Sequence, residues 1–241
     1  MVPIISTREN EMAILRINNR ILKKNGTVLT GGAEPPSPSL PPYTLRLQFL
    51  SEPVTSASDL SCNMDDCTWT KVDADGYVWD WTYEDPDWGG AFDENPPYWG
   101  QFNVIAANTT GVTAMWNLFY RNGLVSVCDM DTSSVTDMNG MFTDTYITGI
   151  GQMDTSSVTN FASMFENCPL TAVPLLDTSS ADDVSRMFFG CTSVSGGAYA
   201  MYQQMSTQAN PPTYHSNCFY NCGSNTVTGA AELAQIPSDW K

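Results

Sequence analysis

Aromatic and acidic side chains are interleaved in one stretch of the first hundred residues, and this stretch is the best suited to bind a ligand. Trp79, Trp81 and Trp88 lie close in sequence to Asp85 and Asp87. Aromatic faces beside carboxylates suit sugars, and carboxylates also bind cations. Acidic residues on a protein surface are more often simply solvated. The sequence therefore leaves two interpretations of this stretch: a ligand-binding surface, or an acidic surface that binds nothing.

Catalytic chemistry has little support in the sequence. His215 is the only histidine, and the chain contains no G-x-S-x-G, H-E-x-x-H or glycine-rich phosphate loop. Residues 73–76, Asp-Ala-Asp-Gly, begin like a calcium loop, but an EF-hand also needs flanking helices, and the turn of a hairpin explains them better. We therefore expect no enzyme activity, no cofactor and no metal site.

One 23-residue pattern recurs through the second half of the chain and must position any binding side chains there. The copies begin at Asn108, Asp131, Asp154 and Asp177. Phenylalanine recurs with the same spacing, at Phe119, Phe142, Phe165 and Phe188. Such a fixed period indicates stacked structural units.

Each copy reads as a short helix and a strand. Apolar residues at i, i+3, i+6 and i+7 predict one buried helical face. In the second copy these residues are Val135, Met138, Met141 and Phe142. Ser134, followed three residues later by Asp137, predicts an approximate capping box. The apolar segment around Leu124 to Met130, with its echoes in the next two copies, predicts a buried strand or an extended turn. Such short elements need to stack to be stable.

The runs DTSSVTDMNGMF and DTSSVTNFASMFENC resemble BspA-like leucine-rich repeats of bacterial surface proteins, which share a DTSxVTxMxxMFxxC core. Similar repeats occur in structural proteins of tailed, crAss-like phages of gut Bacteroidales. The resemblance covers residues 108 to about 191 and implies a right-handed recognition solenoid without catalysis. The predicted fold class is therefore α+β: a leucine-rich-repeat solenoid of about four to five 23-residue units, capped by a small β-rich Trp-containing domain, with an N-terminal anchor segment.

The chain is predicted to have four parts, separated by changes in composition. They are an N-terminal anchor segment (1–32), a Pro-rich linker (33–42), a β-rich capping domain (43–103) and the leucine-rich-repeat solenoid with a C-terminal cap (104–241). Several finer elements are predicted as well. They are a hairpin around Asn25-Gly26, strands near 43–50, 69–72 and 77–83, a helix ending before Pro211, and a helix around 230–236. A disordered basic tail is the alternative to the hairpin.

Charge is unevenly distributed along the sequence. The formal net charge is −16, yet five of the ten basic residues precede residue 25, so residues 1–24 carry +3 and the remainder −19. An acidic body disfavours nucleic acid, whereas the basic leader suits docking on another protein. The predicted attachment residues are Leu15, Arg16, Ile17, Arg20, Ile21, Leu22, Lys23 and Lys24.

The sequence also indicates the state of the cysteines and whether the chain has a membrane span or a signal peptide. Cys168, Cys191 and Cys222 fall in one column of the repeat, which predicts small buried thiols. Cys62 and Cys67 suit either a local disulfide or free thiols. No apolar run of 18 residues exists, and the N-terminus as written does not read as a signal peptide, although the true start is open between Met1 and Met12.

The sequence and the resemblance together predict a non-enzymatic structural and recognition protein of a tailed-phage virion: a head fibre, capsid decoration or tail-associated protein. The expected partners are other virion proteins, of capsid or tail, bound through the N-terminal segment. A bacterial surface protein, a glycan or a second copy of the chain stay open as partners. Two alternatives remain: a secreted bacterial surface adhesin with BspA-like repeats, located at the cell surface, and a carbohydrate-binding module that uses the Trp-rich domain.

Overall fold

The computed structural model describes two compact units of the chain, Met1–Ser39 and Leu40–Lys241. The residues described are 23–24, 27–28, 40–50, 69–72, 76–83, 85–90 and 100–241, and for 23–28 and 69–82 the description is of the backbone. In the first unit, β1 (Lys23–Lys24) pairs antiparallel with β2 (Thr27–Val28), with Lys24 opposite Thr27. This pairing confirms the hairpin predicted around Asn25-Gly26. The four-part division predicted from the sequence stays a prediction.

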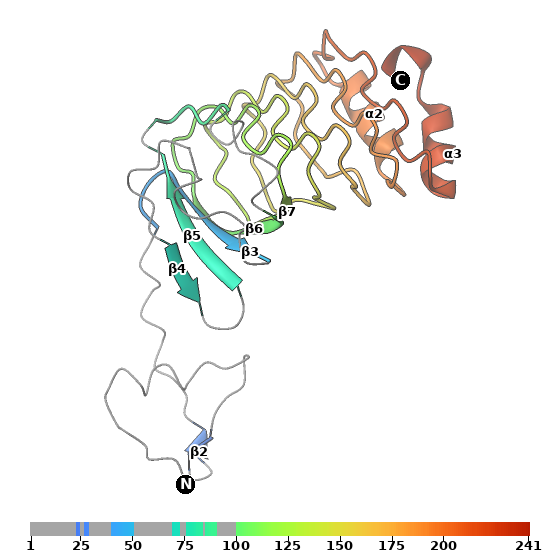
Figure 1. The fold of residues 1–241 in the computed structure, drawn as a ribbon. Helices are drawn as coiled ribbons and strands as arrows, with labels where there is room; N and C mark the ends of the chain where they lie inside the picture. The colour runs from blue at the N-terminus through green and yellow to red at the C-terminus, as the bar shows by residue number, and fades with distance from the viewer. Residues whose placement is uncertain are drawn as a thin grey trace. The chain divides into compact units, whose positions relative to one another are not determined.

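The second unit begins with a five-stranded mixed sheet in the order β4-β5-β3-β6-β7 (Figure 1). Its strands are β3 (Thr44–Phe49), β4 (Trp69–Val72), β5 (Gly76–Thr82), β6 (Phe102–Asn108) and β7 (Leu124–Val127). All neighbours are antiparallel except β6 and β7, which run parallel. The first three strands lie where the sequence predicted them.

Alternation along β3 explains how the sheet joins the core. Leu45, Leu47 and Phe49 are buried, whereas the residues between Leu45 and Phe49 on the other face are only partly covered. At the far edge, a Cβ on Gly123 would lie 1.8 Å from the carbonyl oxygen of Gly100. Glycine therefore permits the close approach through which β7 begins beside β6.

After β6, the copies of the 23-residue pattern lie side by side (Figure 1). Parallel bridges join equivalent residues of successive copies, for example Asp137 with Asn160 and Asn160 with Asp183. Backbone bonds follow the same register: the N–H of Phe119 donates to the carbonyl of Met141 over 2.9 Å. We call residues 109–222 the repeat stack.

The predicted fold class is wrong. The described residues do not form a leucine-rich-repeat solenoid of strand-and-helix units; in the second unit their regular structure is the mixed sheet, two α-helices and a 3₁₀ turn near the C-terminus. Within residues 109–193, β7 is the one strand and no α-helix is present, so the predicted helical face at residues 135–142 is made of turns. A separate β-rich cap is also not seen, because β6 and β7 belong to the same sheet as β3.

The backbone hydrogen bonds explain why no helix forms. Alternate N–H groups, such as those of Met115 and Asn117, donate to carbonyls of the next copy over 2.7–2.8 Å. Those between them, such as Leu118 and Tyr120, bond three residues back, at 3.3 and 3.1 Å. A helix would require every N–H to bond four residues back. Bonds between copies replace that pattern, while apolar residues still face inward.

Phenylalanine rings form the centre of the core. One ring from each copy is fully buried, and neighbouring rings have centroids 5.5–5.9 Å apart and planes within 21°. The five rings are Phe119, Phe142, Phe165, Phe188 and Phe219. Each copy thus contributes one aromatic ring to a column that runs through the stack.

An additional copy precedes the first one seen in the sequence. Asp87 forms a parallel bridge with Ala114, and the N–H of Trp88 donates to the carbonyl of Ala114 over 2.9 Å. These are the contacts that later copies make with one another. The step from Asp87 to Ala114 is 27 residues rather than 23, so the period did not reveal it. Trp88 is fully buried and belongs to the same core as the later copies.

Two helices and the chain end close the other side. α2 (Ala198–Thr207) and α3 (Val227–Gln235) confirm the predicted C-terminal helices, and a 3₁₀ turn, η2 (Ser238–Trp240), follows. The Trp240 ring packs on Phe219, with centroids 6.5 Å apart, and stacks on His215 at 4.3 Å. The fifth copy predicted around Phe219 is therefore present and covered.

Replacing Phe142 or Phe165 with alanine should lower the free energy of unfolding by about 3 to 5 kcal/mol, because either change leaves a cavity between two stacked rings. Urea denaturation measures this. Tyr146→Ala is the control, because Tyr146 is 55% exposed and its loss should cost about 0.5 kcal/mol or less. Equal losses at Phe142 and Tyr146 would contradict the stacked core.

Candidate functional site

Side chains of charged, aromatic and amide residues line one outer surface of the repeat stack. They come from equivalent six-residue segments of five copies. The segments are residues 116–121, 139–144, 162–167, 185–190 and 216–221. We call their outward side chains the polar–aromatic face. It contains both arginines of the stack and two exposed aromatic rings, those of Trp116 and Tyr220.

Left-handed backbone turns set the direction of these side chains. Each of the five segments has a residue with φ between 52° and 61° at its second position and one with φ between 55° and 71° at its sixth. These residues are Asn117, Gly140, Ser163, Arg186 and Asn217, and Arg121, Asp144, Asn167, Gly190 and Asn221. Asn, Asp and Gly adopt this conformation most readily. Between the two turns, the third and fourth residues of every segment are buried in the core, so the outward side chains come from the other positions.

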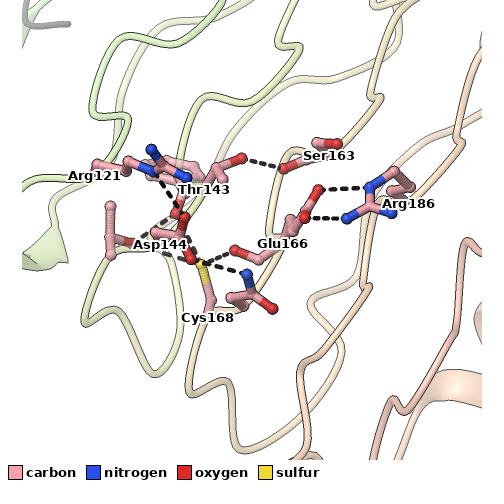
Figure 2. Close-up of polar contacts among 10 residues, drawn as sticks. Arg121, Thr143, Asp144, Ser163, Glu166, Cys168 and Arg186 are labelled. Atoms are coloured by element: carbon pink, nitrogen blue, oxygen red, sulfur yellow. Dashed lines mark hydrogen bonds and ion pairs between the residues drawn. The ribbon is translucent and has the colours of Figure 1, made fainter.

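At the N-terminal half of the face, a chain of side-chain hydrogen bonds links three copies (Figure 2). Arg121 Nε donates to Asp144 Oδ2 over 3.1 Å, and Asn167 Nδ2 donates to Asp144 Oδ1 over 2.9 Å. The hydrogen bond that Arg121 donates to Asp144 raises the pKa of Arg121. The Arg121 guanidinium also lies 4.9 Å from the centre of the Tyr120 ring. Its side chain is nevertheless 66% exposed, so it remains accessible to a partner.

At the C-terminal half, Arg186 forms a two-point ion pair with Glu166 (Figure 2). The Nε–Oε2 distance is 2.9 Å, and the hydrogen bond to Glu166 raises the pKa of Arg186. The same guanidinium lies 3.8 Å above the Phe189 ring, which stacks on Tyr220 with centroids 4.8 Å apart. Arg186 and Phe189 are therefore held in place, and Tyr220, which is 43% exposed, extends the aromatic surface.

Several acidic residues of the repeats hold turns instead of forming a site. Asp131, Asp154 and Asp177 each accept hydrogen bonds from the hydroxyl and from the backbone N–H of the serine two residues on, and these bonds lower the pKa of each carboxyl. Asp137 accepts the backbone N–H of Asn139 over 2.8 Å. The predicted capping box from Ser134 to Asp137 is therefore wrong, because each acid caps its own tight turn.

The predicted ligand surface is only partly described. Trp88 lies inside the core. Asp85 and Asp87 are exposed, and each accepts a backbone N–H two residues on over 2.9 Å. Trp79 and Trp81 lie on β5 opposite residues 47 and 45 of β3, and their side chains are outside the description. The structure therefore does not place the Trp88 ring on a surface with these carboxylates.

The predicted attachment residues lie mostly outside the described chain. Lys23 and Lys24 form β1, and their side chains are not described. The other six are Leu15, Arg16, Ile17, Arg20, Ile21 and Leu22, all outside the described residues. Their role in attachment stays a prediction. In the part of the chain that is described, no helix is long and apolar enough to span a membrane, and no cluster of three metal-binding side chains occurs.

The cysteine column predicted from the sequence is confirmed as a set of buried thiols. Cys168, Cys191 and Cys222 are buried and unpaired with each other, and so is Cys218 beside them. The thiols of Cys168 and Cys191 each donate to a phenylalanine carbonyl 26 residues earlier, over 2.9 Å. Burial raises the pKa of all four, to about 11 for Cys168 and about 12 for Cys222. Cys62 and Cys67 lie outside the described residues.

The sequence analysis missed the polar–aromatic face. Arg121, Asp144 and Asn167 are spaced by 23 residues, so the period contained this signal: equivalent residues with complementary side chains. Arg186 and Glu166 are 20 residues apart, which the period alone does not connect. Their pairing depends on side chains reaching diagonally between neighbouring copies.

Comparison with known proteins finds one related family. Residues 91–199 match the family described as Mycoplasma protein of unknown function, DUF285. This match covers most of the repeat stack and is consistent with BspA-like repeats. No curated protein and no solved structure gives a significant match. The chain thus contains repeats similar to those of this bacterial family.

The Cys168 thiol should make the protein less stable at alkaline pH. The folded pKa, about 11, lies above the usual value of 9.0, so the unfolded chain releases the proton first as pH rises. The stabilisation present below pH 9 is therefore lost between about pH 9 and 11, at up to about 1.4 kcal/mol per pH unit. Urea denaturation at several pH values measures this loss.

Cys168→Ser is the matched variant, because a serine can still donate to the Phe142 carbonyl but does not titrate in this range. Its stability should fall less steeply than that of the unmodified protein above pH 9. Parallel curves for the two proteins would contradict a raised thiol pKa at this position.

Proposed function

We propose that the chain is a non-enzymatic structural and recognition protein that displays the polar–aromatic face to a partner. One observation supports this function above others: exposed charged and aromatic side chains are held in fixed positions by a backbone that bonds each copy to the next. Arg121 is held by Asp144, which is held in turn by Asn167. Binding to such a surface loses little side-chain entropy.

The proposed location is a tailed-phage virion, with the protein serving as a head fibre, capsid decoration or tail-associated protein. The resemblance of the repeats to those of phage structural proteins supports it, as does the contrast between a leader of charge +3 and an acidic body. The rival is a bacterial surface adhesin, which the match to a bacterial family supports. Mass spectrometry of purified particles distinguishes them: detection in bacterial outer-membrane fractions without phage would refute the virion location.

Attachment should depend on the N-terminal segment. Deleting residues 1–32 removes most of the first compact unit and leaves Leu40–Lys241 intact. We expect a protein with an unchanged thermal midpoint that no longer associates with particles, measured by circular dichroism and by mass spectrometry of purified particles. Arg121→Glu is the control, because it alters the face and should leave attachment unchanged. If the truncated chain still occupies particles fully, the anchor lies elsewhere.

Recognition should depend on the polar–aromatic face. Fluorescently labelled full-length chain should bind intact bacterial cells, and Tyr220→Ala should weaken this binding at least tenfold, because aromatic side chains often dominate interfaces. Flow cytometry over a concentration series measures the affinity. Leu175→Ala is a suitable control, since Leu175 is 92% exposed and lies outside the face. Equal effects of the two changes would contradict recognition through this surface.

A further inference from the structure

The polar–aromatic face contains two exposed aromatic rings as well as groups that form directional hydrogen bonds. Trp116 and Tyr220 are 37% and 43% exposed, and Tyr220 forms a nearly parallel pair with Phe189. The ion pair of Arg121 with Asp144 uses the Nε atom, so the terminal nitrogens of this exposed side chain are available to other acceptors (Figure 2). Flat apolar rings beside planar donors and acceptors fit a ligand with both C–H faces and hydroxyl groups.

The charge of this surface restricts the ligand further. Arg121 pairs with Asp144 and Arg186 with Glu166, so the charged groups cancel within the face. Residues 101–241 contain eleven acidic and three basic residues, a net charge of −8. The negative electrostatic potential that results from this net charge repels phosphate, sulfate and carboxylate ligands. A cationic ligand would have to compete with arginines for the two carboxylates. A neutral, hydroxyl-rich ligand avoids both costs.

The repeat of the stack also fits a polymer. Equivalent positions in successive copies are separated by the spacing of the phenylalanine rings, 5.5–5.9 Å. This is close to the length of one pyranose unit in an extended chain. A linear polysaccharide lying along the stack would therefore meet a new set of side chains at each sugar.

From these observations we propose that the polar–aromatic face binds a neutral linear polysaccharide along the direction of the stack. Tyr220 and Trp116 supply rings for the sugar faces, and Arg121, Asp144 and Asn167 exchange hydrogen bonds with its hydroxyls. This assignment rests on the proposed recognition function and names the class of its partner. It differs from a sugar site at Trp79, Trp81 and Trp88, which would lie in another part of the chain.

Affinity electrophoresis of the full-length chain tests this proposal. The gels contain dextran, laminarin, xylan or mannan as neutral probes, and alginate or heparin as anionic ones. We expect at least one neutral polysaccharide to retard the protein. Tyr220→Ala should weaken retardation at least tenfold, and Asp144→Asn severalfold. Asp154→Asn and Leu175→Ala are matched changes outside the face and should have no effect. Thermal melts verify that each variant is folded.

Retardation by anionic polysaccharides alone, by no polysaccharide, or equally for Tyr220→Ala and the unmodified protein would overturn the proposal. The cell-binding measurement separates this failure from that of recognition itself. If no polysaccharide binds but Tyr220→Ala still weakens cell binding, the face recognises another class of partner. If neither measurement responds to Tyr220→Ala, the proposed recognition function fails as well.

Discussion

Backbone hydrogen bonds between successive copies are the constraint on which the rest of the structure depends. Every second N–H of a repeat segment donates to the copy that follows, as from Met115 to Asp137 and from Phe119 to Met141. These bonds hold the copies in parallel register, so equivalent residues must lie next to one another. The same bonds prevent a helix, because an N–H that is used between copies is unavailable within one.

Parallel register joins the core and the outer surface in one arrangement. It stacks the phenylalanines inside and, a few residues away, brings Arg121, Asp144 and Asn167 together outside. The stack has no natural end, because each copy exposes the apolar face that its neighbour would cover. At one end the core continues into the sheet, where the Phe102 ring lies 6.5 Å from that of Phe119, and at the other end the buried Trp240 packs on Phe219.

The sequence predicted which residues of the repeats are buried better than it predicted their local structure. Val135, Met138, Met141 and Phe142 are all buried as predicted. A short helix and a series of tight turns both place residues i and i+3 inward, so the apolar period cannot separate them. The left-handed residues were the signal that excluded a helix, but Ser163 and Arg186 are poor markers of that conformation in a sequence. The fold-class prediction failed for this reason.

The candidate site was missed in the sequence because equivalent positions of the polar–aromatic face hold different residue types from copy to copy, whereas the central position of the core holds the same type. All five copies have phenylalanine at the position of Phe142, whereas the position of Asp144 holds Arg, Asp, Asn, Gly and Asn in turn. A change in the first column creates a cavity, whereas a change in the second leaves the bonds between copies intact, because those bonds involve the backbone. The architecture thus allows the outer side chains to differ from copy to copy at little cost in stability. A sequence period reveals the residues that recur in every copy. Recognition by this face instead depends on residues that differ between copies.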